Sequence, residues 1–133
     1  MAQEARRPWP RLIFDVRQKP NPMPWTIENA LEDQSITHAA CLESEYRIRV
    51  GELPDVKIRV WKLLKGSGRF YFTRSHYIHT PVQPGPHRTS SSHAEDEADA
   101  LHLAVMTLVP HYNEAVAQAH EPRESWLIRN EHF

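Results

Sequence analysis

Residues 45–79 read EYRIRVGELPDVKIRVWKLLKGSGRFYFTRSHYIH, and this stretch decides the fold. Apolar and polar residues alternate with a period of two along 45–51 and 56–64, and 69–79 is rich in aromatic and β-forming residues, which together indicate half-buried β-strands. The residues between these runs, 51–55 and 65–68, supply the glycine, proline and aspartate that turns favour. Three antiparallel strands joined by short turns are therefore predicted.

Helical signals flank the three strands. Thr26 is a favourable N-cap for a helix over residues 27–33, and the pattern allows this helix to resume over 39–42. After the strands, Ser92 and Glu95 have the spacing of a capping box, and apolar residues then recur at helical spacing from 94 to 119. Pro110 lies inside this run and predicts a kink, or two helices that meet at residue 109.

The expected fold class is α+β, with element order (β)-α-β-β-β-α. A three- or four-stranded antiparallel meander has helices on one face, and the long C-terminal helix is kinked or broken near Pro110. A short turn over 125–130 is expected to bring Trp126 and Leu127 onto the core. Residues 1–25 contain five prolines and predict an arm or edge strand, and 26–133 are expected to form a single α+β domain.

Composition narrows the class of protein. The chain has 133 residues, of which 40% are hydrophobic and 25% charged, as in a globular domain. The longest apolar run, 103–106, is far shorter than a membrane span, and the first ten residues lack the apolar segment of a signal peptide. A lone cysteine, Cys41, excludes an internal disulfide. A cytoplasmic protein with no membrane partner is expected.

Alternation divides the strand residues between two faces of the sheet. Tyr46, Ile48, Val50, Val56, Ile58 and Val60 are expected to face the helices, which leaves Arg47, Arg49, Lys57, Arg59 and Trp61 on the outer face. The third strand allows two registers. The register with the more apolar interior places Phe70, Phe72 and Ile78 inside and Tyr71 and Tyr77 outside.

This outer face predicts a non-catalytic module that binds RNA or single-stranded DNA. Cations neutralise phosphates, and flat rings stack on unpaired bases. The expected contact residues are Arg47, Arg49, Lys57, Arg59, Trp61, Tyr71 and Tyr77, joined by His87 and Arg88 from the proline-rich loop over 80–92. A merely solvated face and a protein-binding face are the alternatives, because strands commonly expose Lys and Arg.

A second hypothesis comes from the acidic segments. Residues 46–88 hold nine basic and two acidic side chains, whereas 89–133 hold two basic and eight acidic ones. Glu95, Asp96, Glu97 and Asp99, together with the acidic stretch 28–45, could mimic phosphates. The chain would then be an accessory or inhibitor factor that docks on a nucleic-acid-processing complex, as phage-encoded inhibitors of defence nucleases do. A homodimer that exchanges the proline-rich arm is a third alternative.

No motif predicts an enzyme, a metal site or a cofactor. His93, His102, His111 and His120 recur every nine residues, and alternate members that share a helix face lie about 27 Å apart, too far to share one ion. Cys41 is read as a small hydrophobe, and the Asp55-x-Lys57 spacing as a turn that enters a strand. Catalytic and metal residues are therefore assigned to none.

The order helix, three-strand meander, helix resembles the double-stranded-RNA-binding domain over roughly residues 26–110. That family begins its last helix with a lysine-rich phosphate-binding segment, where this chain has the acids of 95–99. The meander followed by a serine-capped helix is also similar to the HicB type of antitoxin. Both resemblances concern topology alone and imply an α+β fold without assigning a function.

Overall fold

The computed structural model describes residues 24–66, 69–86 and 92–133. These residues fall into two compact units, one ending at Ile36 and the other comprising Thr37–Phe133. The predicted arm over 1–25 lies outside the described residues except for its last two. In the first unit, α1 (Ile27–Ala30) begins after Thr26, whose Oγ1 accepts a hydrogen bond from the Asn29 N–H at 3.0 Å. The expected cap is confirmed, and the helix is shorter than the predicted 27–33.

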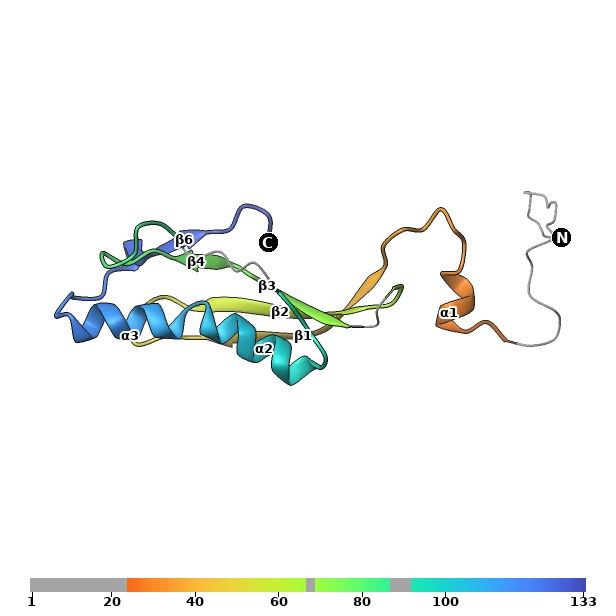
Figure 1. The fold of residues 1–133 in the computed structure, drawn as a ribbon, viewed down its shortest axis with the longest axis horizontal. Coiled ribbons are helices and arrows are strands. Elements are labelled where there is room, and N and C mark those ends of the chain that lie inside the picture. The colour runs from red at the N-terminus through yellow and green to blue at the C-terminus, as the bar shows by residue number, and fades with distance from the viewer. Residues whose placement is uncertain (1–23, 67–68, 87–91) are drawn as a thin grey trace, which may run out of the picture. The chain divides into compact units, whose positions relative to one another are not determined.

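The second unit is built on a four-stranded antiparallel sheet in the order β1-β2-β3-β5. These strands are β1 (Ala40–Ile48), β2 (Val56–Leu63), β3 (Phe70–Arg74) and β5 (His93–Ala94). Two helices, α2 (Glu97–Met106) and α3 (Val109–Ala117), run along one face of it (Figure 1). The predicted α+β fold is confirmed, and so is the break of the C-terminal helix, because Pro110 is accommodated in the first turn of α3.

The predicted helical stretch over 39–42 is wrong. Residues from Ala40 onward belong to β1, where Ala40 pairs with Leu63 and Leu42 with Trp61. The ladder shifts register between Leu42 and Ser44, as at a β-bulge. Pairing with a long neighbouring strand overrides the weak helical signal of two alanines.

The predicted third strand divides at Ser75 into β3 and β4 (His76–Ile78). The Lys57 N–H donates to the Ser75 hydroxyl at 2.9 Å, where an unbroken ladder would offer a backbone carbonyl. Beyond this point β4 pairs with β6 (Leu127–Arg129) in a second, two-stranded sheet. The chain therefore leaves the main sheet at Ser75.

The expected capping box at Ser92 and Glu95 is also wrong. His93 and Ala94 pair with Tyr71 and Phe70 as β5, so the helix starts later. Asp96 is the N-cap instead, and its carboxylate accepts from the Asp99 N–H at 2.8 Å. Aspartate is as good a cap as serine, so the sequence offered two equivalent starts.

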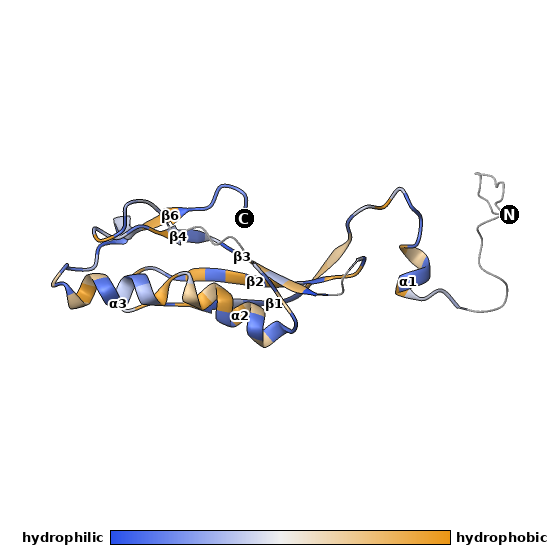
Figure 2. Ribbon diagram, in the orientation of Figure 1, coloured by the Kyte–Doolittle hydropathy of each residue, from blue (hydrophilic) through white to orange (hydrophobic). Residues whose placement is uncertain are grey.

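The core lies between the sheet and the two helices. Alternation along β2 buries Val56, Ile58 and Val60 at 1% exposure or less, and Figure 2 shows the alternating hydropathy of this strand. Opposite them, α2 presents Ala100 and Ala104, both fully buried. The predicted apolar stripe held Leu101 and Val105 in their place, and its Leu108 and Ala115 are fully buried. Small alanines face the sheet because they let the helix backbone approach it closely.

The 3₁₀ helix η1 (Glu124–Trp126) closes the far end of the core. Trp126 is 3% exposed and packs edge-on against Tyr112, with ring centroids 6.0 Å apart. The expectation that the segment near Trp126 returns to the core is confirmed. The chain then continues through β6 toward the outer face of the sheet.

Candidate functional site

The outer face of the main sheet carries a row of rings that crosses its strands. The register sets Leu42, Trp61, Tyr71 and His93 opposite one another on four successive strands. Trp61 and Tyr71 lie nearly parallel, with centroids 6.2 Å apart and planes at 11°, and Tyr71 and His93 are 5.5 Å apart. We call Trp61, Tyr71 and His93 the aromatic row. His38 extends it, with its ring 6.5 Å from Tyr71.

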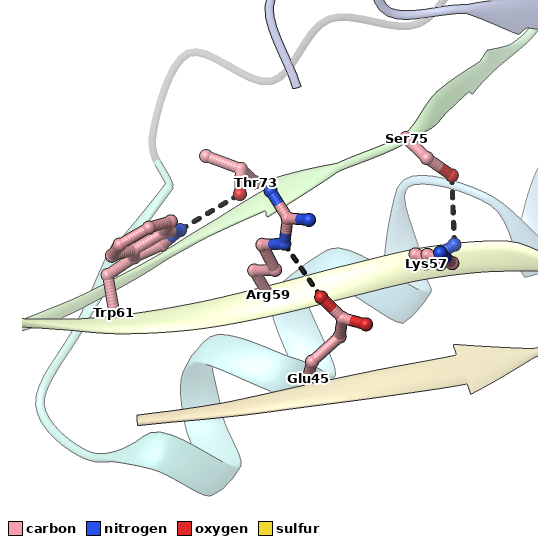
Figure 3. A network of polar contacts seen from close by, with 6 residues as sticks. All are labelled: Glu45, Lys57, Arg59, Trp61, Thr73 and Ser75. Atoms are coloured by element: carbon pink, nitrogen blue, oxygen red, sulfur yellow. Dashed lines mark hydrogen bonds and ion pairs between the residues drawn. The ribbon is translucent and has the colours of Figure 1, made fainter. Parts of the chain in front are cut away.

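Local contacts fix the orientation of the row. The Trp61 indole N–H donates to the Thr73 hydroxyl at 2.9 Å (Figure 3). Partial burial raises the pKa of the Tyr71 phenol above its ordinary value of 10. The ring of Tyr71 is therefore neutral and held between Trp61 and His93. Such a surface offers π-faces that can stack on other flat groups.

Basic side chains occupy the adjoining rows of the same face. Arg59 is paired across the strands with Glu45, at 2.7 Å between Nε and Oε1 (Figure 3). The pKa of Glu45 lies below its ordinary value, mainly because its carboxylate accepts this hydrogen bond from Arg59. Arg47 and Lys57 pair in the register of β1 and β2, and neither side chain forms an ion pair with a carboxylate of the described residues.

Arg49 lies outside this set. It follows the last residue of β1, and its Nε bonds the Asp55 carboxylate at 2.8 Å. Of the four cations that alternation placed on the outer face, two therefore have carboxylate partners. Arg47 and Lys57 remain as the cations of the face with no such partner in the part of the chain that the structure describes.

The C-terminal residues cover part of the outer face, which the sequence prediction took as open. The Arg59 guanidinium lies 4.0 Å from the centroid of the Phe133 ring. Asn130 holds this segment in place: its N–H donates to the Ser75 carbonyl at 2.8 Å, and its side-chain amide donates to the Arg74 carbonyl at 2.8 Å. Chain-end contacts of this kind leave no periodic signal in the sequence.

A pocket of about 400 Å³ opens beside this segment. We call it the basic pocket; its lining includes Arg47, Lys57, Ser75, His76, Arg129 and Phe133. Asp55, Asn130 and Glu131 also line it. Three cations thus meet two carboxylates, of which Asp55 already bonds Arg49.

Other predicted site residues lie elsewhere. Tyr77 belongs to β4, with the Arg74 guanidinium 4.6 Å from its ring centroid, so it is not part of the aromatic row. Arg74 itself is 3% exposed. His87 and Arg88 lie outside the described residues. Conversely, sequence reasoning missed His93, because its strand was read as the start of a helix, and it missed Arg129 and Phe133.

The four acids of the second hypothesis divide into two pairs. Asp96 caps α2, and the Glu97 carboxylate accepts hydrogen bonds from the hydroxyls of Ser44 and Tyr46, the latter at 3.0 Å. Glu95 and Asp99 are exposed, and Glu95 lies 3.4 Å from the Arg69 Nε. Two of the four carboxylates therefore have structural roles within the fold.

Within the described ranges, no group of three or more His, Cys, Asp and Glu side chains is arranged to hold a metal ion. The helices of the same residues are all too short or too polar to cross a bilayer. Comparison with protein-family models, with curated proteins and with solved structures found no match for this chain.

Proposed function

We propose that the outer face of the main sheet binds single-stranded nucleic acid, RNA or DNA. Bases would stack on the aromatic row, and phosphates would contact Arg47 and Lys57. The alignment of Trp61, Tyr71 and His93 across three strands is the observation that carries this proposal. Rings in such a row offer a continuous stacking surface, which unpaired bases can use and bases inside a duplex cannot.

The positions of the basic side chains on the outer face support a nucleic-acid strand that runs parallel to β2. Trp61 and Lys57 are four residues apart, which corresponds to about 13 Å at the usual rise of a strand. A sugar–phosphate backbone that follows this direction passes from the rings to Arg47 and Lys57. The acidic first turn of α2 does not oppose such a strand, because α2 packs on the other face of the sheet (Figure 1).

Substitution of Trp61 tests this proposal. Trp61→Leu removes the ring and is expected to weaken binding of an internally labelled oligonucleotide by about 5- to 150-fold, since one base–ring stack contributes about 1–3 kcal/mol. Trp61→Phe keeps a ring but loses the hydrogen bond to Thr73, so it should restore most of the affinity. Fluorescence anisotropy measures both variants, and circular dichroism checks that each is folded.

Salt dependence supplies the control. The affinity of the unmodified chain should fall steeply with added salt, and Lys57→Gln should reduce the slope of the log–log plot by about 0.7. Equal affinities of the Leu and Phe variants of Trp61 would contradict the stacking, and affinity that survives about 0.5 M salt unchanged would contradict the phosphate contacts.

Substitution of two acidic residues distinguishes this proposal from the hypothesis that the chain binds a partner protein. Glu95 and Asp99 can be neutralised together, as Glu95→Gln and Asp99→Asn, without touching the Asp96 cap or the Glu97 hydrogen bonds. If the chain binds nucleic acid, the double variant should bind it slightly more tightly. If the acids mimic phosphates toward a partner, the same variant should lose a partner that copurifies with the unmodified chain.

A further inference from the structure

The proposed function makes no use of the pocket's third cation, Arg129, or of its neighbour His76. Arg129 lies opposite His76 in the pairing of β6 with β4, and both line the basic pocket with Arg47 and Lys57. Elements distant in sequence thus bring three cations to one concave site. These three cations outnumber the two acidic residues of the pocket, and one of the two, Asp55, already bonds Arg49, so the pocket is suited to an anion.

The Ser75 hydroxyl joins the backbone of β2 to the ring of His76. The Ser75 hydroxyl accepts from the Lys57 N–H at 2.9 Å and lies 2.8 Å from the His76 Nδ1. The hydroxyl has one proton and two acceptor lone pairs, so it can donate to Nδ1 while it accepts from the Lys57 N–H. In that tautomer neutral His76 carries its proton on Nε2 and presents an N–H donor.

We infer that the basic pocket binds a terminal phosphate monoester of a nucleotide, and, resting on the proposed function, that this is the phosphorylated end of the bound strand. A monoester carries a charge of about −1.5 to −2 at pH 7, against −1 for an internal diester, and so matches three cations better. The pocket is walled by the C-terminal segment, whose Phe133 lies over Arg59. This wall favours a nucleic-acid strand that ends in the pocket over a strand that continues past it.

The size of the pocket agrees with this ligand. A volume of about 400 Å³ falls in the range of small-molecule sites and exceeds what a phosphate alone would fill. The Phe133 ring gives the wall an aromatic portion beside the cations. Phosphate held by charge and a nucleoside held by an apolar ring are the two parts of nucleotide recognition. A free mononucleotide and a strand end share this chemistry, and the test separates them.

Internally labelled oligonucleotides of one sequence, with a 5′ phosphate, a 3′ phosphate or hydroxyls at both ends, provide the first test. One phosphorylated form is expected to bind at least about tenfold more tightly than the hydroxyl form, a difference of about 1.4 kcal/mol. Arg129→Gln should abolish this preference and leave the affinity of the hydroxyl form unchanged. Arg123→Gln removes an exposed arginine outside the pocket and should keep the preference.

Titration of His76 by NMR, with inorganic phosphate or a mononucleoside monophosphate, provides the second test. Burial and then the charge of Arg129 lower the pKa of His76 below its ordinary 6.5. Asp55, Glu131, Lys57 and Arg47 also face the pocket. A bound anion favours the protonated imidazole, so the pKa of His76 should rise on binding, and affinity should increase as the pH falls. The ligand-induced rise should vanish in Arg129→Gln.

The outcomes distinguish the pocket from the proposed function. Equal binding of the three oligonucleotides, with loss of affinity in Trp61→Leu, overturns the terminal-phosphate site and leaves the stacking face standing. A rise in the pKa of His76 with the mononucleotide, in a chain that binds no oligonucleotide, supports the pocket as a site for free nucleotides and contradicts the proposed strand. A rise that persists unchanged in Arg129→Gln overturns the pocket.

Discussion

Gly51 occupies a position that no other residue can fill without strain. Its φ is +58°, in the left-handed region, and a Cβ built on it would collide with the Tyr112 hydroxyl and ring. Tyr112 cannot retreat freely, because its ring packs against the buried Trp126. Gly51→Ala is therefore expected to lower the free energy of unfolding by about 2–4 kcal/mol, measured by urea denaturation.

Gly85 offers the matched control for this substitution. A Cβ added there meets no atom within 4 Å, and its backbone is outside the left-handed region. Gly85→Ala should change the free energy of unfolding by no more than about 0.5 kcal/mol. Comparable stabilities of the two alanine variants would show that the contact between Gly51 and Tyr112 does not constrain the fold.

At the scale of the element, α3 ends in a Schellman motif that contains an alanine where glycine is favoured. Ala119 has a φ of 68°, its N–H bonds the Val116 carbonyl at 2.9 Å, and the His120 N–H bonds the Ala115 carbonyl at 3.0 Å. An alanine in this conformation costs about 1 kcal/mol relative to glycine. Ala119→Gly is expected to raise the free energy of unfolding by about 0.5–1 kcal/mol, measured by thermal and urea unfolding.

Ala117→Gly makes the same chemical change two residues earlier, at the last residue of the helix. Glycine is unfavourable in a helix and its cost is largest in the interior, so this variant should be less stable by about 0.5 kcal/mol. Opposite signs for the two variants are the expected result. If both variants were less stable, the extra conformational entropy that glycine gives the unfolded chain would outweigh the strain removed at residue 119.

Periodicity predicted the helices and strands whose positions depend on the local sequence pattern. It failed where a contact with a distant residue determines the end of an element. Alternation from Val56 to Val60 fixed the inward face of β2, and Pro110 located the break between α2 and α3. The end of β3 depends on one hydrogen bond to the Ser75 hydroxyl, which no alternation encodes. His93 was missed because a two-residue strand is too short to show a period.

The candidate site divides in the same way. Trp61 and Tyr71 could be predicted to share a face, because parity alone determines it once the strands are assigned. The pairing of Arg59 with Glu45, and the basic pocket beside Phe133, could not be predicted. They depend on cross-strand register and on the return of the C-terminal segment, both of which are long-range contacts.

At the scale of the whole molecule, every residue of the three core clusters belongs to the unit Thr37–Phe133. A fragment of residues 37–133 is therefore expected to fold alone and to melt within about 5 °C of the full chain, a difference of about 1 kcal/mol or less in a domain of this size. Circular dichroism of the fragment and of the full chain measures this difference.

A second fragment, residues 49–133, is the matched control, because it lacks β1 and with it Tyr46 and Ile48, which pack against the core. It leaves β2 with an unpaired edge and should fail to fold cooperatively. If the fragment 37–133 were unfolded, residues before Thr37 would have to contribute to the stability of the sheet. If both fragments melted like the full chain, β1 would be dispensable, and the outer face could not depend on its pairing with β2.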